Sequence, residues 1–169
     1  TRTDQIWVGD LTYLRLGKAG EPKIHTSLPS MTIGKAFRLH DGKDVTIIAT
    51  GTMLETANAA RELLLADGLS VRLVSMPCVK PLDEQEVAAA AKETGLLVTL
   101  EEHGPIGGLG SAVAETLSLH DLRTVPHLLI SAPSTFAESV GSQAFLREKA
   151  GLTAPLVREA ILKKIKDKR

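Results

Sequence analysis

The chain has 169 residues, 43% of them apolar, so it is long enough and hydrophobic enough for one globular domain and not for a disordered chain. Its 20 basic and 20 acidic residues cancel, so no general electrostatic attraction to nucleic acid or to an anionic membrane is expected. No apolar run reaches the roughly 20 residues that span a bilayer, and we expect neither nucleic-acid nor membrane partners.

The first forty residues differ from the rest in their glycine and proline content. A short β-like run at 12–16 is followed by closely spaced glycines and prolines, which are typical of turns and extended linkers. From about residue 36 the pattern becomes regular. We therefore divide the chain into a linker-like segment, 1–40, and a regular domain, 41–169.

The regular domain is expected to open with two strands. Residues 36–39 are strand-like, Asp41-Gly42 is a strong hairpin signal, and 45–50 is an apolar, β-branched run. The sequence predicts that these two strands form an antiparallel pair.

Helices and strands alternate after this pair. Asp83 and Glu86 form a candidate capping box at the start of an alanine-rich helix, and Thr153 with Pro155 marks the start of the last helix. The expected helices are 52–66, from 83 to near 95, 110–119 and two at the end of the chain; the expected strands are 71–74, 96–100 and 127–130. Because strand–helix–strand units cross over right-handed, we predict an α/β three-layer sandwich. Its five-stranded sheet should be mostly parallel with one antiparallel strand.

The strongest local motif is the segment 101–111, EEHGPIGGLGS, between a strand and a helix. A glycine turn at a helix N-terminus can bind phosphate through backbone N–H groups, but neither the dinucleotide pattern nor the phosphate-loop pattern is present. The alternative is a tight turn, or a loop facing another subunit, and we favour it over the phosphate site. The candidate loop or interface residues are Glu102, His103, Gly107, Gly108 and Gly110.

Candidates for catalysis are sparse. Glu102 beside His103 suggests acid–base chemistry, but neighbouring residues at a strand end point in opposite directions. The single cysteine, Cys78, excludes a disulfide framework, fits a reducing compartment such as the cytoplasm, and is more often a small buried residue than a nucleophile. The five histidines show no metal-ligand spacing. Arg15, before a glycine turn, could bind a phosphate or carboxylate, although a surface ion pair is the commoner role.

Four segments together resemble the transketolase family. They are YLRLGKAGEP at 13–22, GKDVTIIATGTM at 42–53, VSMPCVKPLD at 74–83 and EEHGPIGGLG at 101–110. Each segment alone is a weak signal, but four segments in this order and spacing are specific. The resemblance covers nearly the whole chain. The nearest resemblance is to the C-terminal subunit of the split type of transketolase, which implies that 1–40 is the end of a pyrimidine-binding domain with its linker.

The resemblance implies a role in ketol transfer between sugar phosphates, with thiamine diphosphate and Mg²⁺ as cofactors of the complete enzyme. In the family an N-terminal part holds the diphosphate and metal, and a middle domain carries the activating glutamate. This sequence has neither the Gly-Asp-Gly motif nor that glutamate region, so we expect the chain alone to bind no cofactor and to be inactive. Arg15 matches the family arginine that contacts the substrate phosphate. The expected partners are a second copy, as a homodimer, and a thiamine-binding N-terminal subunit or domain.

Two alternatives stay open at this point. The chain could be the assembly module of a 2-oxoacid dehydrogenase β subunit or belong to an enzyme like deoxyxylulose-phosphate synthase, both relatives of transketolase. A free-standing nucleotide site at 107–111 is the weaker alternative, because it would rest on the glycine turn alone.

Overall fold

The structure is a computed structural model that describes residue 24 and residues 30–135 and 140–167. Arg15 and the β-like run at 12–16 lie outside the described residues. The role of Arg15 therefore stays a prediction.

Ten elements follow one another in the described residues. They are β1 (Phe37–His40), β2 (Val45–Ala49), α1 (Met53–Ala66), β3 (Val71–Ser75), α2 (Glu84–Glu93), β4 (Leu96–Leu100), α3 (Leu109–Leu119), β5 (His127–Ile130), α4 (Gln143–Lys149) and α5 (Ala154–Lys166). Each helix and strand expected after residue 45 is present within a few residues of its predicted bounds.

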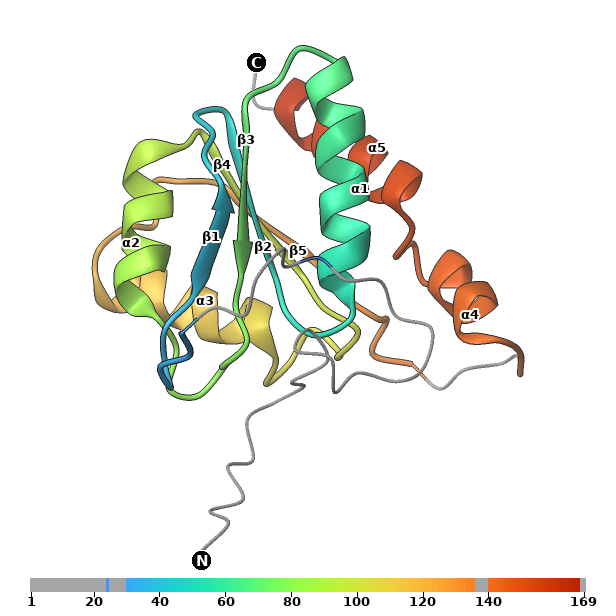
Figure 1. Cartoon of the computed structure of the whole chain (residues 1–169), viewed down its shortest axis with the longest axis horizontal. Coiled ribbons are helices and arrows are strands. Elements are labelled where there is room, and N and C mark those ends of the chain that lie inside the picture. Colours follow the sequence, from blue (N-terminus) through green and yellow to red (C-terminus); the bar gives the residue numbers. More distant parts are fainter. Residues whose placement is uncertain (1–23, 25–29, 136–139, 168–169) are drawn as a thin grey trace, which may run out of the picture.

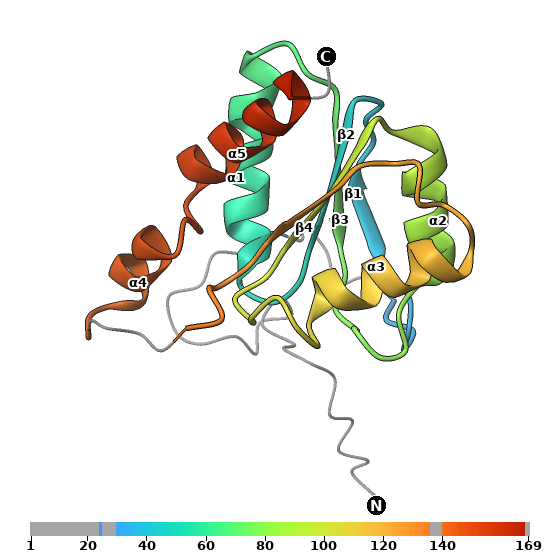
Figure 2. The ribbon, with the colours of Figure 1, turned by 180° about the vertical axis from the view of Figure 1, so that it is seen from behind.

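The five strands form one sheet in the order β1-β3-β2-β4-β5. β2 pairs in parallel with β3 and β4, β4 pairs in parallel with β5, and β1 is antiparallel to β3. Helices α1 and α5 cover one face of the sheet, and α2 and α3 cover the other (Figures 1 and 2). The predicted three-layer sandwich is confirmed.

The predicted hairpin between the first two strands is wrong. β1 pairs with β3, so the chain reverses between β1 and β2 by crossing the start of β3, and the two strands are not neighbours. Gly42 makes this crossing close: a Cβ atom there would lie 2.2 Å from the backbone nitrogen of Arg72. The amides of Lys43 and Asp44 then donate to the carbonyl of Ser70, at 3.2 and 2.9 Å. The Asp-Gly pair signals a chain reversal in sequence, and here it serves a crossover.

Strand β1 precedes residue 41 and is nevertheless part of the sheet. Its approach is fixed by Asp83, the N-cap of α2, whose carboxylate accepts from the amide of Glu86 at 3.3 Å and from that of Ala36 at 3.0 Å. The cap at Asp83 is confirmed, but the Glu86 side chain contacts Arg38 of β1 instead of the cap backbone. The expected boundary between 1–40 and 41–169 stays a prediction.

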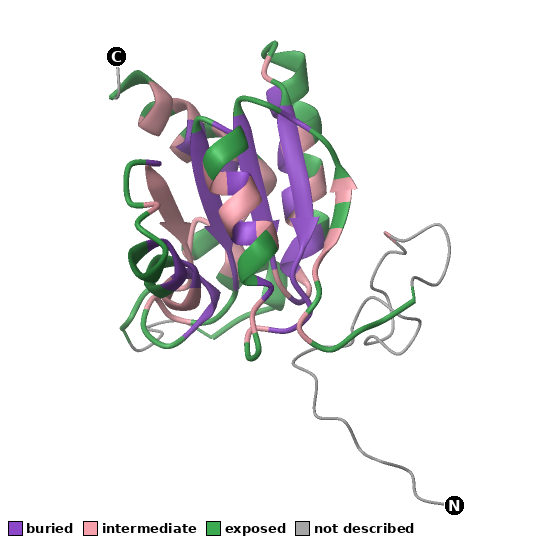
Figure 3. Ribbon diagram, turned by 90° about the vertical axis from the view of Figure 1, so that its left-hand side faces the viewer, coloured by how far each residue is buried: buried purple, intermediate pink, exposed green. Residues whose placement is uncertain are grey.

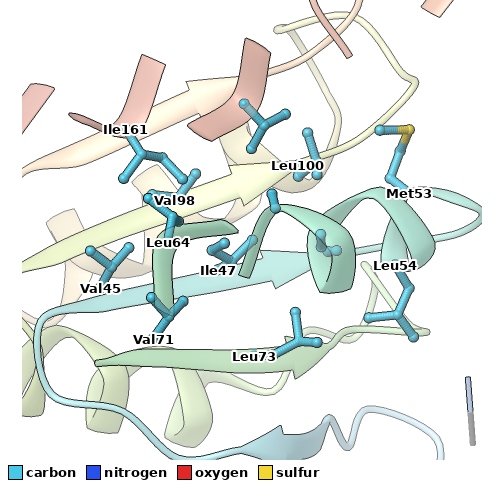
Figure 4. Packing of buried hydrophobic residues seen from close by; sticks show 14 of the residues in the cluster. Val45, Ile47, Met53, Leu54, Leu64, Val71, Leu73, Val98, Leu100 and Ile161 are labelled. Atoms are coloured by element: carbon cyan, nitrogen blue, oxygen red, sulfur yellow. The ribbon is translucent and has the colours of Figure 1, made fainter. Parts of the chain in front are cut away.

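The core lies on both faces of the three central strands, β2, β3 and β4, in which every residue is buried (Figure 3). On one face, side chains such as Ile47, Leu73 and Val98 pack against α1 and α5 (Figure 4). On the other face, Ile48, Val74 and Leu97 pack under α2 and α3. Strands buried on both faces show no polar alternation, which explains their continuous apolar sequences.

The candidate site at the carboxyl edge of the sheet

The strand order defines one crevice in the sheet. The chain leaves β2 toward β3 on one side, and later crosses to β4 on the other side of β2. The carboxyl ends of β2 and β4 are therefore the topological switch point, where open α/β sheets usually bind ligands. This edge lies at the bottom of Figure 1, and it carries the 101–111 motif.

The side chain of Glu101, the first residue after β4, lies at the N-terminus of α3. Its carboxylate accepts hydrogen bonds from the amides of Leu109 and Gly110, both at 2.7 Å, and the residue is only 1% exposed. A helix N-terminus stabilises a negative charge through its free amides and its dipole. The chain's own carboxylate thus takes the place that a phosphate would need.

The glycines of the turn make this arrangement possible. A Cβ atom on Gly108 would lie 2.1 Å from a carboxylate oxygen of Glu101, and one on Gly110 would lie 2.2 Å from the Leu129 side chain. Gly107 has φ +80°, a left-handed conformation that favours glycine. Its amide donates to Ser111 Oγ at 3.0 Å. The turn therefore packs α3 closely against the sheet and offers no phosphate cradle at these amides.

Glu102 is the centre of a polar network across the switch point. Its carboxylate accepts from Thr52 Oγ1 at 2.7 Å, Arg147 Nε at 2.7 Å and Gln143 Nε2 at 3.1 Å. Arg147 Nη2 also donates to Thr52 Oγ1 at 2.6 Å, which closes the network. The network joins the turn after β2, the turn after β4 and helix α4.

The electrostatics of Glu102 follow from these contacts. Burial favours the neutral acid, but the hydrogen bonds from Arg147 and Thr52 outweigh it, so the pKa of Glu102 is lowered below its ordinary value. A carboxylate held in its charged form by an arginine is a poor general acid at neutral pH. The arrangement suits a structural clasp that holds α4 to the sheet.

His103 does not join this network. Its Nδ1 lies 2.9 Å from the carbonyl oxygen of Gly104, and its own carbonyl accepts from the amide of Ala132 at 3.1 Å. The predicted candidates thus lie in one loop but make separate contacts. Their assignment to an interface stays a prediction.

The other candidates lie away from this edge or in the core. Cys78 is buried, 6% exposed. His127 Nε2 lies 3.0 Å from Thr99 Oγ1, and burial lowers the pKa of this histidine. In the described parts of the chain no three His, Cys, Asp or Glu side chains gather as metal ligands, and none of the described helices could cross a membrane.

Sequence reasoning missed Glu101, Thr52 and Arg147 as parts of this edge. Thr52 could have been found, because it follows β2 as Glu102 follows β4, and parallel neighbours bring their carboxyl ends together. Arg147 gave no signal, since it lies 45 residues beyond Glu102 on a short helix.

A family model described as "Transketolase, C-terminal domain" matches residues 34–157. The 6-deoxy-6-sulfo-D-fructose transketolase subunit SqwH of Clostridium sp. (strain MSTE9) is 41% identical over 142 residues, 84% of this chain and 43% of that subunit. The 1-deoxy-D-xylulose-5-phosphate synthase of Desulforudis audaxviator (strain MP104C) is 43% identical over 130 residues, 77% of this chain and 20% of the synthase.

A solved structure agrees with these matches. A split-gene transketolase, described as an inactive β4 tetramer, superposes with a TM-score of 0.81 and 40% identity over 89% of this chain and 48% of its own. The chain therefore spans less than half the length of these relatives.

Proposed function

The chain belongs to the transketolase C-terminal domain family, and on this premise we propose that it forms the C-terminal part of a cytoplasmic, thiamine-diphosphate-dependent transketolase that transfers ketol units between sugar phosphates. The similarity to the split-gene transketolase, 40% identity with a TM-score of 0.81, carries this proposal. A transketolase subunit among the matched relatives supports it.

In this proposal the chain contributes assembly and one substrate contact, and the cofactor is held elsewhere. Members of the transketolase and deoxyxylulose-phosphate synthase families depend on thiamine diphosphate. The glycine turn does not fit the diphosphate, because Glu101 already accepts from the amides of Leu109 and Gly110. We assign thiamine diphosphate and Mg²⁺ to an N-terminal subunit or domain, and the substrate phosphate to Arg15.

The direct test measures cofactor binding and ketol transfer with the chain alone and with a thiamine-binding N-terminal part. The chain alone should show no turnover of sugar phosphates and no micromolar binding of thiamine diphosphate by calorimetry. Adding the N-terminal part should restore transfer. Turnover by the chain alone, or no transfer by the combination, would overturn the proposal.

Arg15 has its own test in the active combination. Arg15→Ala should raise KM for a phosphorylated acceptor about tenfold or more, as expected for loss of a charge-assisted contact, with a smaller change in kcat. Arg123→Ala, an exposed arginine, is the matched control and should change neither constant. Equal constants for Arg15→Ala and the parent protein would refute the contact.

We also propose self-association, with the homodimer as the unit. The split-gene relative is described as a β4 tetramer, which two dimers can form. Light scattering of the isolated chain should give an even multiple of its mass, 18.0 kDa. A monomer at all concentrations would contradict this.

A second candidate is a synthase of 1-deoxy-D-xylulose 5-phosphate, favoured by the 43% identity to such an enzyme. The same active combination, assayed for formation of that product, decides between the two. Docking of a 2-oxoacid dehydrogenase partner is the remaining alternative, and co-purification with a lipoyl-bearing acyltransferase would favour it.

A further inference from the structure

An open groove lies at the amino edge of the sheet, opposite the edge that carries Glu102. The amino edge is at the top of Figure 1. It has a volume of about 550 Å³, in the range of pockets that bind small molecules. The groove is lined by Arg38, Asp41, Gly42, Lys43, Ser70, Arg72 and Glu93. Three cationic side chains, one hydroxyl and two carboxylates thus gather here.

Arg72 is the unusual member of this lining. Its side chain is only 5% exposed, and its Nη2 donates to the Glu93 carboxylate. Its Nε and Nη1 are buried without a hydrogen-bond partner in the described structure. A guanidinium has five N–H donors in a planar fork, and a buried charged donor without an acceptor is costly. In the described residues, Glu93 thus supplies an acceptor for only part of the Arg72 fork.

Glu93 meets this need only in part. It ends helix α2, and its side chain is 51% exposed, so it can rotate into solvent. Because Arg72 is buried, its guanidinium needs another acceptor when Glu93 leaves, and an incoming anion supplies one. A competing anion that displaces Glu93 would gain access to the guanidinium.

The rest of the lining adds further donors, and one more carboxylate at Asp41. Lys43 is exposed at the groove, and its backbone amide donates to Ser70 Oγ at 3.2 Å, which leaves the Ser70 hydroxyl proton to donate elsewhere. Arg38 is anchored by Glu86 at 2.9 Å and Asp41 at 3.3 Å, so it forms a fixed wall. Arg72, Lys43 and Ser70 all line the groove and carry N–H or O–H donors for the oxygens of an anion.

We propose that this groove binds a small phosphorylated molecule, with the Arg72 guanidinium gripping the phosphate after Glu93 is displaced. Lys43 and Ser70 contact the remaining oxygens, and the groove volume accommodates the organic part. Bidentate pairing with phosphate is the interaction that an arginine fork makes best. This inference does not depend on the proposed ketol transfer, because none of its residues has been assigned to that reaction.

The test is direct binding to the 169-residue chain by calorimetry. Inorganic phosphate and glycerol 3-phosphate are the probes, with sodium chloride at matched ionic strength as the reference. A free phosphate site binds both probes equally, whereas a site for a phosphate ester binds glycerol 3-phosphate more tightly. We expect one site per chain with tighter binding of the ester.

Three variants locate the site. Arg72→Met should abolish binding, and Lys43→Gln should weaken it about two- to fivefold, the range of an exposed charge pair. Glu93→Gln should tighten binding by a similar factor, because it removes the competing carboxylate. Lys163→Gln and Glu115→Gln, which make the same charge changes on exposed positions of α5 and α3, should leave affinity unchanged.

Three results would overturn the proposal. Heats no larger than those of chloride would mean that the groove binds no phosphate. Binding that survives in Arg72→Met would mean an adventitious ion only. Since Lys43 and Glu93 are exposed, their variants should fold even if Arg72→Met does not, and an affinity that neither of them changes would also refute the site.

Discussion

The two edges of the sheet treat a buried charge in opposite ways. At the carboxyl edge, Glu101 is 1% exposed and accepts from two amides of α3. At the amino edge, the Arg72 side chain is 5% exposed, and its Nε and Nη1 have no acceptor in the described structure. In the described residues the fold satisfies the first charge fully and the second only in part, through Glu93. At the carboxyl edge, Glu101 thus already occupies the amides of α3, whereas the partly paired Arg72 supports the proposal that the amino edge binds an anion.

The largest expected effect comes from removing the satisfied charge. Glu101→Leu leaves the amides of Leu109 and Gly110 buried without an acceptor, at about 1–3 kcal/mol for each group. We expect the free energy of unfolding, measured with urea, to fall by about 3 kcal/mol or more. The exposed Glu115→Gln on the same helix should stay within about 0.5 kcal/mol of the parent chain. A loss for Glu101→Leu no larger than that of the control would show that the bonds from Glu101 to these amides do not stabilise the fold.

A smaller effect is expected from the glycine that admits this carboxylate. Gly108→Ala places a Cβ atom 2.1 Å from Glu101 Oε2, so the carboxylate has to shift away from its amides. Overpacking of this kind costs about 1–3 kcal/mol in the free energy of unfolding. Gly104→Ala is the matched control in the same loop, because its Cβ atom would meet nothing within 4 Å. Similar urea midpoints for the two variants would show that the close approach does not matter.

Much of this architecture was predictable from sequence, because periodicity and capping signals are local. The buried strands and the Asp83 cap follow from short segments whose neighbours reinforce them. The pairing of β1 was not predictable, since Asp41-Gly42 fits both a hairpin and a crossover over β3. The hydrogen-bond partners of Glu101 and Arg72 were not predictable either. They depend on tertiary contacts, which a glutamate in a glycine motif and an arginine in a strand do not reveal from sequence.

The polar network around Glu102 should contribute about 1 kcal/mol or less to the free energy of unfolding, because the Glu102 side chain is 37% exposed. This contribution should depend on pH. The folded pKa of Glu102 lies below that of the unfolded chain, so its contribution is fully present above about pH 4.3. This contribution is lost as the pH falls through the lowered pKa. Urea unfolding of Glu102→Gln should therefore differ from the parent chain at pH 7 and converge with it in acid. If the two free energies of unfolding differ by the same amount from pH 7 to pH 3, the ionised form of Glu102 does not stabilise the fold.

The smallest expected change in stability tests most directly whether Arg72 is left partly unpaired. Arg72→Met replaces a buried guanidinium that is only partly hydrogen-bonded with an apolar side chain of similar length, and the partner left behind, Glu93, is 51% exposed and stays hydrated. In chloride buffer without phosphate, we expect the free energy of unfolding to stay within about 1 kcal/mol of the parent chain or to rise. Arg61→Met is the matched control: Arg61 Nε donates to the Val71 carbonyl at 3.1 Å, and losing that bond should cost about 1 kcal/mol. A loss of several kcal/mol for Arg72→Met would mean that the fold already satisfies this charge. The two edges would then be alike, and the groove would have no unmet donors to offer a ligand.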